Sequence, residues 1–416
     1  MNIDNLKNIC VGGWGKTGIS LCNLLLALNK RVRVSEMKER GSFPSSMVDS
    51  FIEKGVKIEF GGHTKNFIKG SQLLVISPGI DTINSPLIKF ANELGILCVG
   101  EIEFCFWLSQ AKFVAITGTN GKTTTTHLTH EILKKKRKRV FLGGNIGIPL
   151  SSLILNTKKN DIVVVEVSSF QLETIIEFKP YVAALLNIEP DHLDRYPRIQ
   201  AYLDAKLNIF KKQDTKDWAI LNKNINFRGK IEKGINAQKV YFSNELSNEN
   251  FSCIYKIASI FGVSKIDCIN MCSSFNGLPH RLEFVKNING VNFINDSKAT
   301  NPSSTIWALK NIKTPIILLA GGKDKGLDYS LIRPYLKKVK KINLFGEASS
   351  KIKGFIDKKI RTESFSSLQD IIASSFVEAK TGDTILFSPM CASYDMFDNY
   401  MQRGSKFIEI VNNLDP

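Results

Sequence analysis

The sequence predicts an α/β protein built on parallel sheets, and three observations support this fold class. Short apolar runs alternate with longer helical patterns almost throughout, which is the order that produces parallel strands joined by helices. Some runs, such as Ile162–Val165, contain only apolar residues, as expected of strands that are covered on both faces. The length of 416 residues corresponds to about three domains at roughly 150 residues each.

The predicted strands fall into three series, which open near residues 9, 113 and 291. Gly277-Leu278-Pro279 is the expected break between the second and third series, and residues 99–111 are expected to link the first and second. Residues 222–250 are rich in Asn and Lys and weakly periodic, so we expect a loop-rich excursion there. The predicted strands are Ile9–Val11, Val32–Ser35, Leu73–Ser77, Phe113–Thr117, Val140–Leu142, Ile162–Val167, Val182–Asn187, Val291–Asn295, Ile316–Ala320, Lys341–Phe345 and Thr384–Ser388.

The chain is basic, with 56 Lys and Arg against 39 Asp and Glu, a net charge of +17. The densest basic run, Lys134–Arg139, ends a predicted helix, where cations suit the negative end of the helix dipole. No aromatic residue interleaves the run, as a base-stacking surface would require. We therefore expect no nucleic-acid partner, although the charge keeps a basic nucleotide- or nucleic-acid-binding protein as an alternative. A diffuse positive field also suits anionic small molecules.

The eight cysteines form no CxxC pair, and Cys268 and Cys272 have no histidine close by in sequence. A zinc site or a disulfide framework is therefore not expected, and scattered thiols in a reducing compartment fit the pattern better. The N-terminal residues lack the features of a secretory signal, and no apolar run approaches the ~20 residues that span a bilayer. We expect a cytoplasmic protein without membrane insertion.

The sharpest local signal is Gly118-Thr119-Asn120-Gly121-Lys122-Thr123-Thr124, which lies between a predicted strand and the helical stretch Thr125–Leu133. Glycines let the backbone curl so that its N–H groups face a phosphate, and the following helix adds positive potential. Lys122 would reach the outer phosphates of a nucleotide, and the Thr123 hydroxyl would bind magnesium. Ile116 stands where the general pattern has its first glycine, and a plain glycine-rich turn is the alternative.

A second glycine pattern, Gly13-Trp14-Gly15-Lys16-Thr17-Gly18, follows the first strand and has the form GxGxxG. Glu36 follows the next strand, near where a ribose-binding acid would lie. Taken alone, this pattern favours dinucleotide binding. Another nucleotide diphosphate would fit the same turn, and a tight strand-to-helix turn explains the glycines equally well.

Polar groups follow several later strands, at the edge where open α/β sheets build their sites. Glu166 ends one buried strand and His192 lies just past another, so both are candidate magnesium ligands, the carboxylate being the more usual type. A structural ion pair and an ordinary partly buried histidine are the alternatives. Two dense polar clusters, 295–302 and 388–395, follow strands in the last third, and helix capping explains only one residue in each.

Together these segments resemble the Mur ligases of bacterial cell-wall synthesis. The resemblance runs from the first strand to the final helix and rests on GTNGKTT (118–124), GGNIG (143–147), EVSSFQLE (166–173), NIEPDHLDRYP (187–197), GLPHR (277–281), NDSKATN (295–301), SPMCASYDMFDNYMQRG (388–404) and GGWGKTGIS (12–20). It implies a Rossmann-like domain that holds the UDP part of a substrate (1–98), a central P-loop ATPase-type domain (99–278) and a Rossmann-like domain that binds an amino acid (279–416).

The resemblance implies an ATP-dependent, amide-bond-forming ligase of peptidoglycan biosynthesis that acts through an acyl phosphate. The opening and closing segments favour the addition of D-glutamate to UDP-N-acetylmuramoyl-L-alanine, and a sister ligase that adds another amino acid is the alternative. Folylpolyglutamate synthase shares the ATPase core but should lack a UDP-binding first domain. The expected cofactors are ATP and two magnesium ions, the expected partners are small-molecule substrates only, and the expected state is a monomer.

The resemblance also implies a role for individual residues. The catalytic residues would be Lys122, His192, Lys206 and Lys298, and the metal ligands would be Thr123, Glu166, His192 and Lys206. ATP would contact Gly118, Thr119, Asn120, Gly121, Lys122, Thr123, Thr124, His280, Arg281 and Asp296. The UDP substrate would contact Gly13, Gly15, Lys16, Thr17, Gly18, Glu36, Ser77, Gly79, Asn145, Ser168 and His192. D-Glutamate would contact Thr300, Lys325, Ser393 and Tyr400.

Three of these positions raise questions of their own. Tyr400 stands where phenylalanine is expected, which leaves stacking intact, and the segment Gly321–Lys325 leaves Lys323 as an alternative to Lys325. Lys206, in the helical AYLDAKLNIF, matches a lysine that the family carbamylates. Carbamylation would turn a cation into an anion with two hard oxygens, which suit magnesium. From the residues alone, a surface lysine that snorkels from an amphipathic helix is the preferred interpretation.

Overall fold

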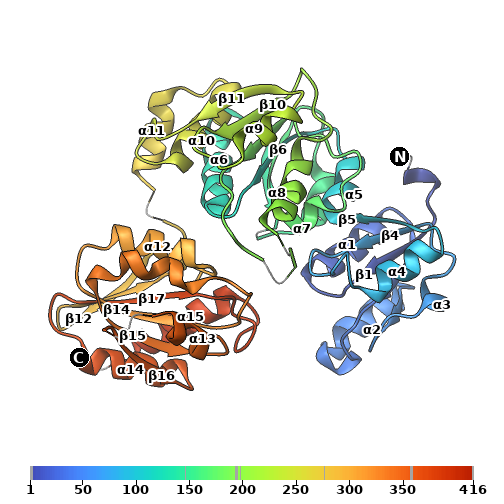
Figure 1. Ribbon diagram of the computed structural model, residues 1–416. Helices are drawn as coiled ribbons and strands as arrows, with labels where there is room; N and C mark the ends of the chain where they lie inside the picture. The colour runs from blue at the N-terminus through green and yellow to red at the C-terminus, as the bar shows by residue number, and fades with distance from the viewer. Residues whose placement is uncertain are drawn as a thin grey trace. The chain divides into compact units, whose positions relative to one another are not determined.

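The structure is a computed structural model that describes residues 3–145, 147–192, 195–196, 198–275, 277–356 and 359–414. The chain divides into two compact units, the first made of Met1–Ile188 with Tyr202–Ser274 and the second of Glu189–Ala201 with Phe275–Pro416. Three sheets are present among the described residues, two in the first unit and one in the second (Figure 1).

The first sheet has five parallel strands in the order β3-β2-β1-β4-β5. The strands β2 and β3 lie on one side of β1, and the chain then returns to place β4 and β5 on the other side. The strand order therefore reverses between β1 and β4. Such a point opens a crevice at the carboxyl ends of the two strands. The elements are η1 (Ile3–Asn5), β1 (Asn8–Gly12), α1 (Lys16–Ala27), β2 (Arg31–Ser35), η2 (Arg40–Ser42), α2 (Ser45–Glu53), β3 (Lys57–Glu59), α3 (Lys65–Ile68), β4 (Leu73–Ile76), α4 (Pro86–Glu93) and β5 (Leu97–Gly100).

The second sheet has six parallel strands in the order β11-β10-β9-β6-β8-β7. Here β6 lies between β8 and β9, so the segments that follow these three strands meet at one edge of the sheet. The elements are α5 (Glu101–Trp107), β6 (Lys112–Thr117), α6 (Lys122–Lys136), β7 (Val140–Gly144), η3 (Leu150–Ser152), η4 (Ile154–Asn156), β8 (Ile162–Glu166), α7 (Ser169–Leu172), β9 (Val182–Leu185), α8 (Ile199–Leu207), η5 (Asn208–Phe210), β10 (Trp218–Asn222), α9 (Arg228–Lys233), β11 (Gln238–Phe242), α10 (Glu249–Ile260) and α11 (Lys265–Ser273).

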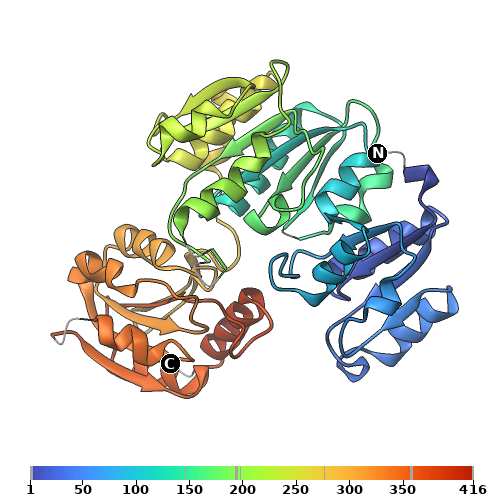
Figure 2. The same ribbon diagram turned by 45° about the vertical axis from the view of Figure 1, so that its right-hand side comes forward.

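The third sheet is mixed, in the order β12-β13-β17-β14-β15-β16, with β12 antiparallel to β13 and the other neighbours parallel. Alternate side chains of its central strands enter two separate cores, as the two-residue period of a strand requires. Leu318 and Leu386 pack with α12, η6 and α13, whereas Leu319 and Phe387 pack with α14 and α15 on the other face. Figure 2 shows helices on both sides of this sheet. The elements are β12 (Glu283–Ile288), β13 (Val291–Asn295), α12 (Pro302–Asn311), β14 (Ile316–Gly321), η6 (Tyr329–Lys338), β15 (Val339–Phe345), α13 (Ser349–Phe355), β16 (Arg361–Phe365), α14 (Leu368–Glu378), β17 (Thr384–Met390) and α15 (Tyr400–Asn412).

The predicted α/β class with parallel sheets is confirmed, and each predicted strand corresponds to an observed one. One expectation was wrong, since residues 222–250 contain α9, β11 and the start of α10 rather than a loop-rich excursion. Residues 99–111 connect the first sheet to the second as expected, and they contain the end of β5 and the buried helix α5. The domain limits at 98 and 278 stay predictions. None of the helices among the described residues has the length and apolar character needed to cross a bilayer.

Candidate active site

The predicted phosphate loop joins β6 to α6, as the order strand, loop and helix requires. Gly118 has φ +154° and Gly121 has φ +82°, conformations that side chains rarely adopt. A Cβ at Gly118 would also lie 2.9 Å from the Cβ of Leu186, so the loop has no room for one. The helix begins directly at Lys122, so its N-terminal end, with the positive end of its dipole, meets the loop. This geometry is that of an anion-binding turn.

Asn187, which the sequence did not single out, holds the same loop from the neighbouring strand. Its side-chain oxygen accepts hydrogen bonds from the backbone N–H of Thr119 (3.1 Å) and of Asn120 (2.8 Å), and its amide nitrogen donates to the Asn120 carbonyl (3.0 Å). Asn187 follows β9, which pairs with β6. Only the strand order brings the two segments together, so the sequence signal was limited to a polar residue at a strand end.

Asn250 is a second residue that the sequence missed. It lies in the first turn of α10, and its side-chain oxygen is 2.5 Å from the position that a Cβ on Gly121 would occupy. The amide therefore packs directly against the phosphate loop. The segment that contains it was expected to be a loop-rich excursion, so no role was assigned there.

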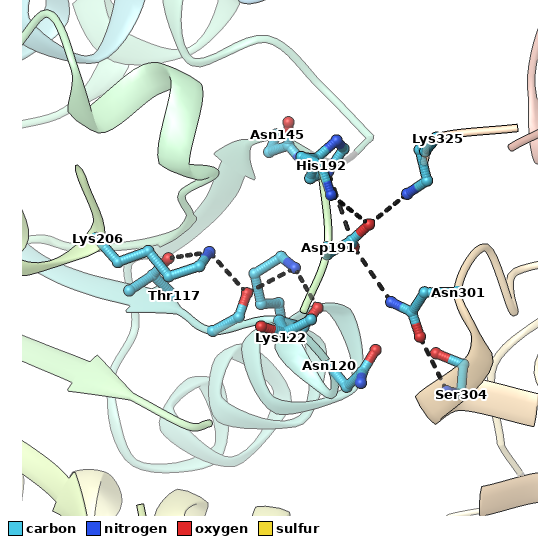
Figure 3. Close-up of polar contacts among 12 residues, drawn as sticks. Thr117, Asn120, Lys122, Asn145, Asp191, His192, Lys206, Asn301, Ser304 and Lys325 are labelled. Atoms are coloured by element: carbon cyan, nitrogen blue, oxygen red, sulfur yellow. Dashed lines mark hydrogen bonds and ion pairs between the residues drawn. The ribbon is translucent and has the colours of Figure 1, made fainter. Parts of the chain in front are cut away.

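Two lysines converge on the phosphate loop (Figure 3). The Lys122 ammonium donates to the carbonyls of Gly118 (2.9 Å) and Thr119 (2.8 Å), and the Lys206 ammonium donates to the same Gly118 carbonyl (2.9 Å). Lys206 is 1% exposed, and its ammonium lies 4.5 Å from the centre of the Tyr202 ring. The preferred interpretation of Lys206 as a surface lysine is therefore wrong, because α8 faces the sheet at this residue. Two cations around one carbonyl favour the arrival of an anion.

Glu166 ends β8 in register with Ile116 of β6, next to the phosphate loop. The carboxylate is 2% exposed, and its Oε1 accepts a hydrogen bond from the Asn145 side chain (3.0 Å). Its Oε2 is buried and has no hydrogen-bond partner among the described residues. A buried carboxylate oxygen without a partner is costly unless a cation or a donor meets it. As a hard ligand beside a phosphate loop, this oxygen fits magnesium.

Other predicted residues near this edge have local roles. Ser168 is the N-cap of α7 and forms a capping box with Gln171, so its side chain stabilises the start of this helix. No group of three or more His, Cys, Asp or Glu side chains that could hold a metal occurs within the described ranges. Magnesium commonly keeps several waters and substrate oxygens among its ligands, so one carboxylate and a hydroxyl suffice for a site that is completed by a nucleotide.

The Gly13–Gly18 loop occupies the crevice between β1 and β4 in the first sheet. A Cβ at Gly18 would lie 1.9 Å from the Gly13 carbonyl oxygen, so this glycine lets α1 begin close to the strand. The Glu36 carboxylate accepts hydrogen bonds from the backbone N–H of Trp14 (2.5 Å) and of Lys38 (2.8 Å). Glu36 therefore shapes the glycine loop as well as lying beside it. The loop that carries Ser77 and Gly79 follows β4 at the same crevice.

The second unit places His280 against Gly404. A Cβ at Gly404 would lie 2.3 Å from Nδ1 of His280, so only glycine allows this contact. The histidine has φ +63°, and its Nδ1 lies 2.9 Å from the side-chain nitrogen of Asn295. The Tyr400 ring meets the imidazole edge-on, with centroids 6.3 Å apart, and the Lys298 ammonium lies 4.8 Å from the centre of the Tyr400 ring. The predicted residues His280, Lys298 and Tyr400 thus form one group.

Asp296 lies in the same region, directly after β13. Its carboxylate accepts hydrogen bonds from the Ser388 hydroxyl (2.7 Å) and the Leu282 backbone N–H (3.3 Å). Burial raises the pKa of Asp296 to about 7, and these hydrogen bonds and the charge of Arg281 oppose the rise. The predicted clusters 295–302 and 388–395 are therefore joined by a carboxyl that an incoming cation would readily ionise.

Arg403, which was not predicted as a site residue, ties the two clusters together. It is fully buried and donates to the carbonyls of Ser297 (2.8 Å), Cys391 (3.1 Å) and Ala392 (3.0 Å). Burial lowers the pKa of Arg403 to about 10, so the guanidinium remains charged at neutral pH. The planar donor fork suits several carbonyls at once. Ser393, which follows these carbonyls directly, is held in place by this arrangement.

Lys325 and Asp191 form a buried ion pair in the second unit (Figure 3). The Asp191 carboxylate also accepts hydrogen bonds from the Asn301 side chain (3.1 Å) and the His192 backbone N–H (2.9 Å). Although burial raises the pKa of Asp191, the charges of Lys325 and His192 and the hydrogen bonds from the Lys325 and Asn301 side chains outweigh it and hold the pKa well below its usual range. Lys323 is exposed by contrast and pairs with Glu347.

His192 has φ +54° and belongs to the second unit. Thr123, Glu166 and Lys206 belong to the first unit, so the four predicted metal ligands are divided between the two units. Leu193, Asp194 and Pro197 of the 187–197 segment and Ile146 of the 143–147 segment lie outside the described residues. Asp191 was quoted within a motif but not predicted as a site residue. The only indication of Asp191 in the sequence was its position directly before the candidate metal ligand His192.

The chain has a phosphate-loop turn on a parallel sheet, and further α/β sheets precede and follow this sheet in the sequence, an arrangement typical of the nucleotide-binding class of α/β proteins. Three family models match the chain: "Mur ligase MurD-like, N-terminal domain" at 7–100, "Mur ligase middle domain" at 116–274 and "Mur ligase, glutamate ligase domain" at 280–391. The chain belongs to the Mur ligase family. Its similarity to curated members of that family extends over nearly the whole sequence.

The curated relatives include proteins named UDP-N-acetylmuramoylalanine--D-glutamate ligase. That of Thermoanaerobacter sp. (strain X514) is 37% identical over 449 residues and that of Geotalea uraniireducens (strain Rf4) is 37% identical over 445, each match covering 98% of both chains. Among solved structures, the MurF ligase from Thermotoga maritima in complex with ADP matches with a TM-score of 0.61 at 17% identity, covering 91% of this chain and 93% of that one. A pseudomurein peptide ligase type C from Methanothermus fervidus matches with a TM-score of 0.60 at 18% identity, covering 98% and 100%. These structural matches show the fold.

Proposed function

We propose that this protein uses ATP to join D-glutamate to UDP-N-acetylmuramoyl-L-alanine in peptidoglycan synthesis. The observation that carries this conclusion is the 37% identity, over 98% of both chains, to proteins named for that reaction. The geometry agrees with it, since an anion-binding turn with two lysines lies on the central sheet and a buried lysine–aspartate pair lies in the second unit. Each part suits one anionic substrate.

The first chemical step makes the L-alanine carboxylate reactive. The γ-phosphoryl group of ATP passes to that carboxylate and gives an acyl phosphate, and ADP leaves. The N–H groups of the loop and the start of α6 would cradle the phosphates, and Lys122 would stabilise the charge on the moving group. Lys298 and His280 would hold the nucleotide from the third domain. The hydrogen bonds of Asn187 to the loop keep its curl before any nucleotide arrives.

Magnesium, when bound, would neutralise phosphate charge at this edge of the central sheet. The Glu166 carboxylate, whose Oε2 has no hydrogen-bond partner among the described residues, and the Thr123 hydroxyl would hold it, and His192 and a modified Lys206 would complete the set for two ions. The Lys206 ammonium is buried beside the loop, where a second cation repels both Lys122 and the metal. Carbamylation of Lys206 would remove that conflict.

In the second step, the amine of D-glutamate attacks the acyl carbon, the amide bond forms and inorganic phosphate leaves. Lys325 would pair with a carboxylate of D-glutamate, and the hydroxyls of Thr300 and Ser393 and the ring of Tyr400 would complete the pocket. Burial and the ion pair with Asp191 favour Lys325 over the exposed Lys323 for this role. Water must be kept from the acyl phosphate, because hydrolysis competes with amide formation.

The proposal is tested by the choice of amino acid. Purified protein is supplied with ATP, magnesium and UDP-N-acetylmuramoyl-L-alanine, and phosphate release is measured with D-glutamate, L-glutamate, L-alanine, a diamino acid or a D-alanyl dipeptide. We expect release with D-glutamate alone, and none without the UDP substrate. Release that depends on another of these amino acids would assign a sister ligase instead.

The basic run at residues 134–139 gives no support to the nucleic-acid alternative. Arg139 pairs with Asp161, Lys136 lies 3.9 Å from Asp267, and Arg137 donates to the Phe261 carbonyl, so half of the run serves contacts within the central domain. A titration with duplex DNA across a salt series checks this point. Tight binding that persists at physiological salt would revive the alternative.

The two lysines of the 321–325 segment should differ strongly in their effect on D-glutamate. Replacing Lys325 by Ala removes a charged partner of the carboxylate, and the loss of one charge-assisted hydrogen bond raises the KM for D-glutamate by about tenfold to a hundredfold. The KM for ATP should stay within about twofold. The matched control is Lys323→Ala, which removes an exposed ammonium that pairs with Glu347 and should change neither constant. The reverse pattern would assign the role to Lys323.

The Gly404→Ala variant should weaken ATP binding through His280. The new methyl group would lie 2.3 Å from the imidazole, so the histidine must leave its position. Overpacking of this kind costs about 1–3 kcal/mol. Because about 1.4 kcal/mol corresponds to a tenfold change in affinity, we expect the KM for ATP to rise by about tenfold. Gly354→Ala is the control, because this glycine lies in α13 with nothing within 4 Å of its would-be Cβ. Equal ATP affinity in both variants would show that His280 does not contribute to nucleotide binding.

A further inference from the structure

Glu101 is a buried carboxyl at the junction of the first and second sheets. It is the first residue of α5 and follows β5 directly, and it is 1% exposed. Its Oε1 accepts hydrogen bonds from the backbone N–H (2.9 Å) and the hydroxyl (2.6 Å) of Ser151 in η3. The Ser151 hydroxyl lies 2.8 Å from that of Ser20 in α1. One carboxyl oxygen thus connects α5, η3 and, through Ser151, the helix that follows the glycine loop.

The other oxygen of Glu101 faces a small cavity. Glu101 Oε2 and the Ser77 hydroxyl are both buried, and neither has a hydrogen-bond partner within the described part of the chain. Both residues line a cavity with about 10 Å³ available to the centre of a water molecule, together with Ile76, Gly100 and Gln171 among others. That volume is about the minimum that one ordered water needs. Two buried polar atoms without partners around such a space are the usual setting of a structural water.

Ser77 is the link from this cavity to the glycine loop. Its backbone N–H donates to the Gly12 carbonyl (3.0 Å), and its hydroxyl would lie 3.3 Å from a Cβ on Gly13 and 3.5 Å from one on Gly18. The serine side chain therefore packs beneath both ends of the Gly13–Gly18 turn. The hydroxyl is buried and Ser77 lines the cavity, so this side chain connects the cavity to the glycine turn.

We propose that one ordered water bridges Glu101 Oε2 to the Ser77 hydroxyl, and that Glu101 through this bridge is a positioning residue for the loop that receives the UDP substrate. The part of the inference that concerns the substrate rests on the proposed function of that loop, whereas the water site does not. Burial raises the pKa of Glu101, and the hydrogen bonds from Ser151 and from the backbone of Leu150 oppose that rise. A water can donate or accept, so the bridge holds for either protonation state of the carboxyl. The position of the glycine loop relative to the central sheet then depends on the Glu101 carboxyl.

The water itself is tested by crystallography at a resolution that shows ordered solvent. We expect density for one water within hydrogen-bond distance of both atoms in the wild-type protein and its loss in Ser77→Ala. A cavity without that water in the wild-type protein overturns the proposal. This readout needs no substrate and no activity, so it stands even where the ligase assignment fails.

The positioning role is tested by measuring the affinity for UDP-N-acetylmuramoyl-L-alanine by calorimetric titration. Ser77→Ala should weaken binding by about tenfold, the effect of leaving one buried polar group without its partner. The matched control is Ser71→Ala, which removes another buried hydroxyl without a described partner, two residues before the same strand β4 and not among the residues that line the cavity. It should leave binding unchanged. The KM values for ATP and D-glutamate should stay within about twofold in both variants.

Glu101 is tested by two substitutions that differ in hydrogen bonding. Glu101→Gln keeps an acceptor for Ser151 and offers an amide to the water, so it should bind the UDP substrate like the wild type. Glu101→Ala should weaken binding about as much as Ser77→Ala, and the double variant should be no weaker than Glu101→Ala alone. Additive losses would show that the two residues act separately and would overturn the bridge. Should Glu101→Ala fail to fold, a weakened Glu101→Gln with an intact melting temperature would overturn it equally.

Discussion

The Lys122→Ala variant is expected to lose phosphoryl transfer while keeping its fold. The Lys122 ammonium lies over the loop, 2.9 Å from the Gly118 carbonyl and 2.8 Å from that of Thr119, at the start of α6. In the proposed mechanism a phosphoryl group in transit would develop charge at this place, so removal of one preorganised donor should lower kcat by about 10²–10³-fold. Phosphate release with all three substrates measures the loss. Far-UV circular dichroism and thermal melting report on the fold.

Lys135→Ala is the matched control for this variant. Lys135 is an exposed lysine near the other end of the same helix, so its removal changes the net charge equally but leaves the loop untouched. It should be fully active. Undiminished ligation by Lys122→Ala, with Lys135→Ala also active, would show that Lys122 of the loop is not needed for ATP cleavage. It would contradict the proposed mechanism.

The Lys206→Ala variant is expected to lose most activity and to regain part of it when a small carboxylate is added. Lys206 is buried beside the loop, where its ammonium shares the Gly118 carbonyl with Lys122. The proposed carbamate at this place would supply two hard oxygens to magnesium, so its removal should lower kcat by about 10²–10³-fold. Formate or acetate would supply similar oxygens in the cavity that alanine leaves. Phosphate release with and without these acids measures the rescue.

The same modification is open to a direct measurement. Wild-type protein in buffer freed of carbon dioxide should lose activity and recover it with bicarbonate, and native mass spectrometry should detect one added carbon dioxide. Lys211→Ala, which removes an exposed lysine shortly after η5, should show neither loss nor rescue. Activity that ignores bicarbonate, together with no rescue of Lys206→Ala, would rule out the carbamate and leave the ligase assignment intact.

The fold class was predictable because the central strands are continuous apolar runs. Buried parallel strands such as β8 and β14 differ from helices by their length and by their β-branched residues. The strands that the sequence missed are mostly short or partly exposed. β3 has three residues, β16 has no fully buried residue, and β12 pairs with one neighbour only. Edge strands need little hydrophobicity, so their pattern is close to that of loops.

The site was predictable only as far as it is local. The Gly118–Thr124 loop combines strand, turn and helix within one stretch of sequence, and its glycines have the conformations that the turn requires. Asn187, Asn250 and Arg403 are remote in sequence from the groups that they hold, and only strand order and helix packing bring them together. Lys206 illustrates the same limit, since the amphipathic pattern of its helix does not reveal which face meets the sheet.

The passage from β5 into α5 bears on how this polypeptide can be divided. Ile102 and Phe104 are fully buried, and the Glu103 carboxylate accepts hydrogen bonds from the backbone N–H of Ile176 (2.9 Å), Glu177 (2.7 Å) and Phe178 (3.0 Å). Proteases that need several extended residues should therefore leave this junction intact. A shortened gene that stops at residue 98 would truncate an edge strand and should yield an insoluble fragment, whereas one that keeps the first two sheets together retains every one of these contacts.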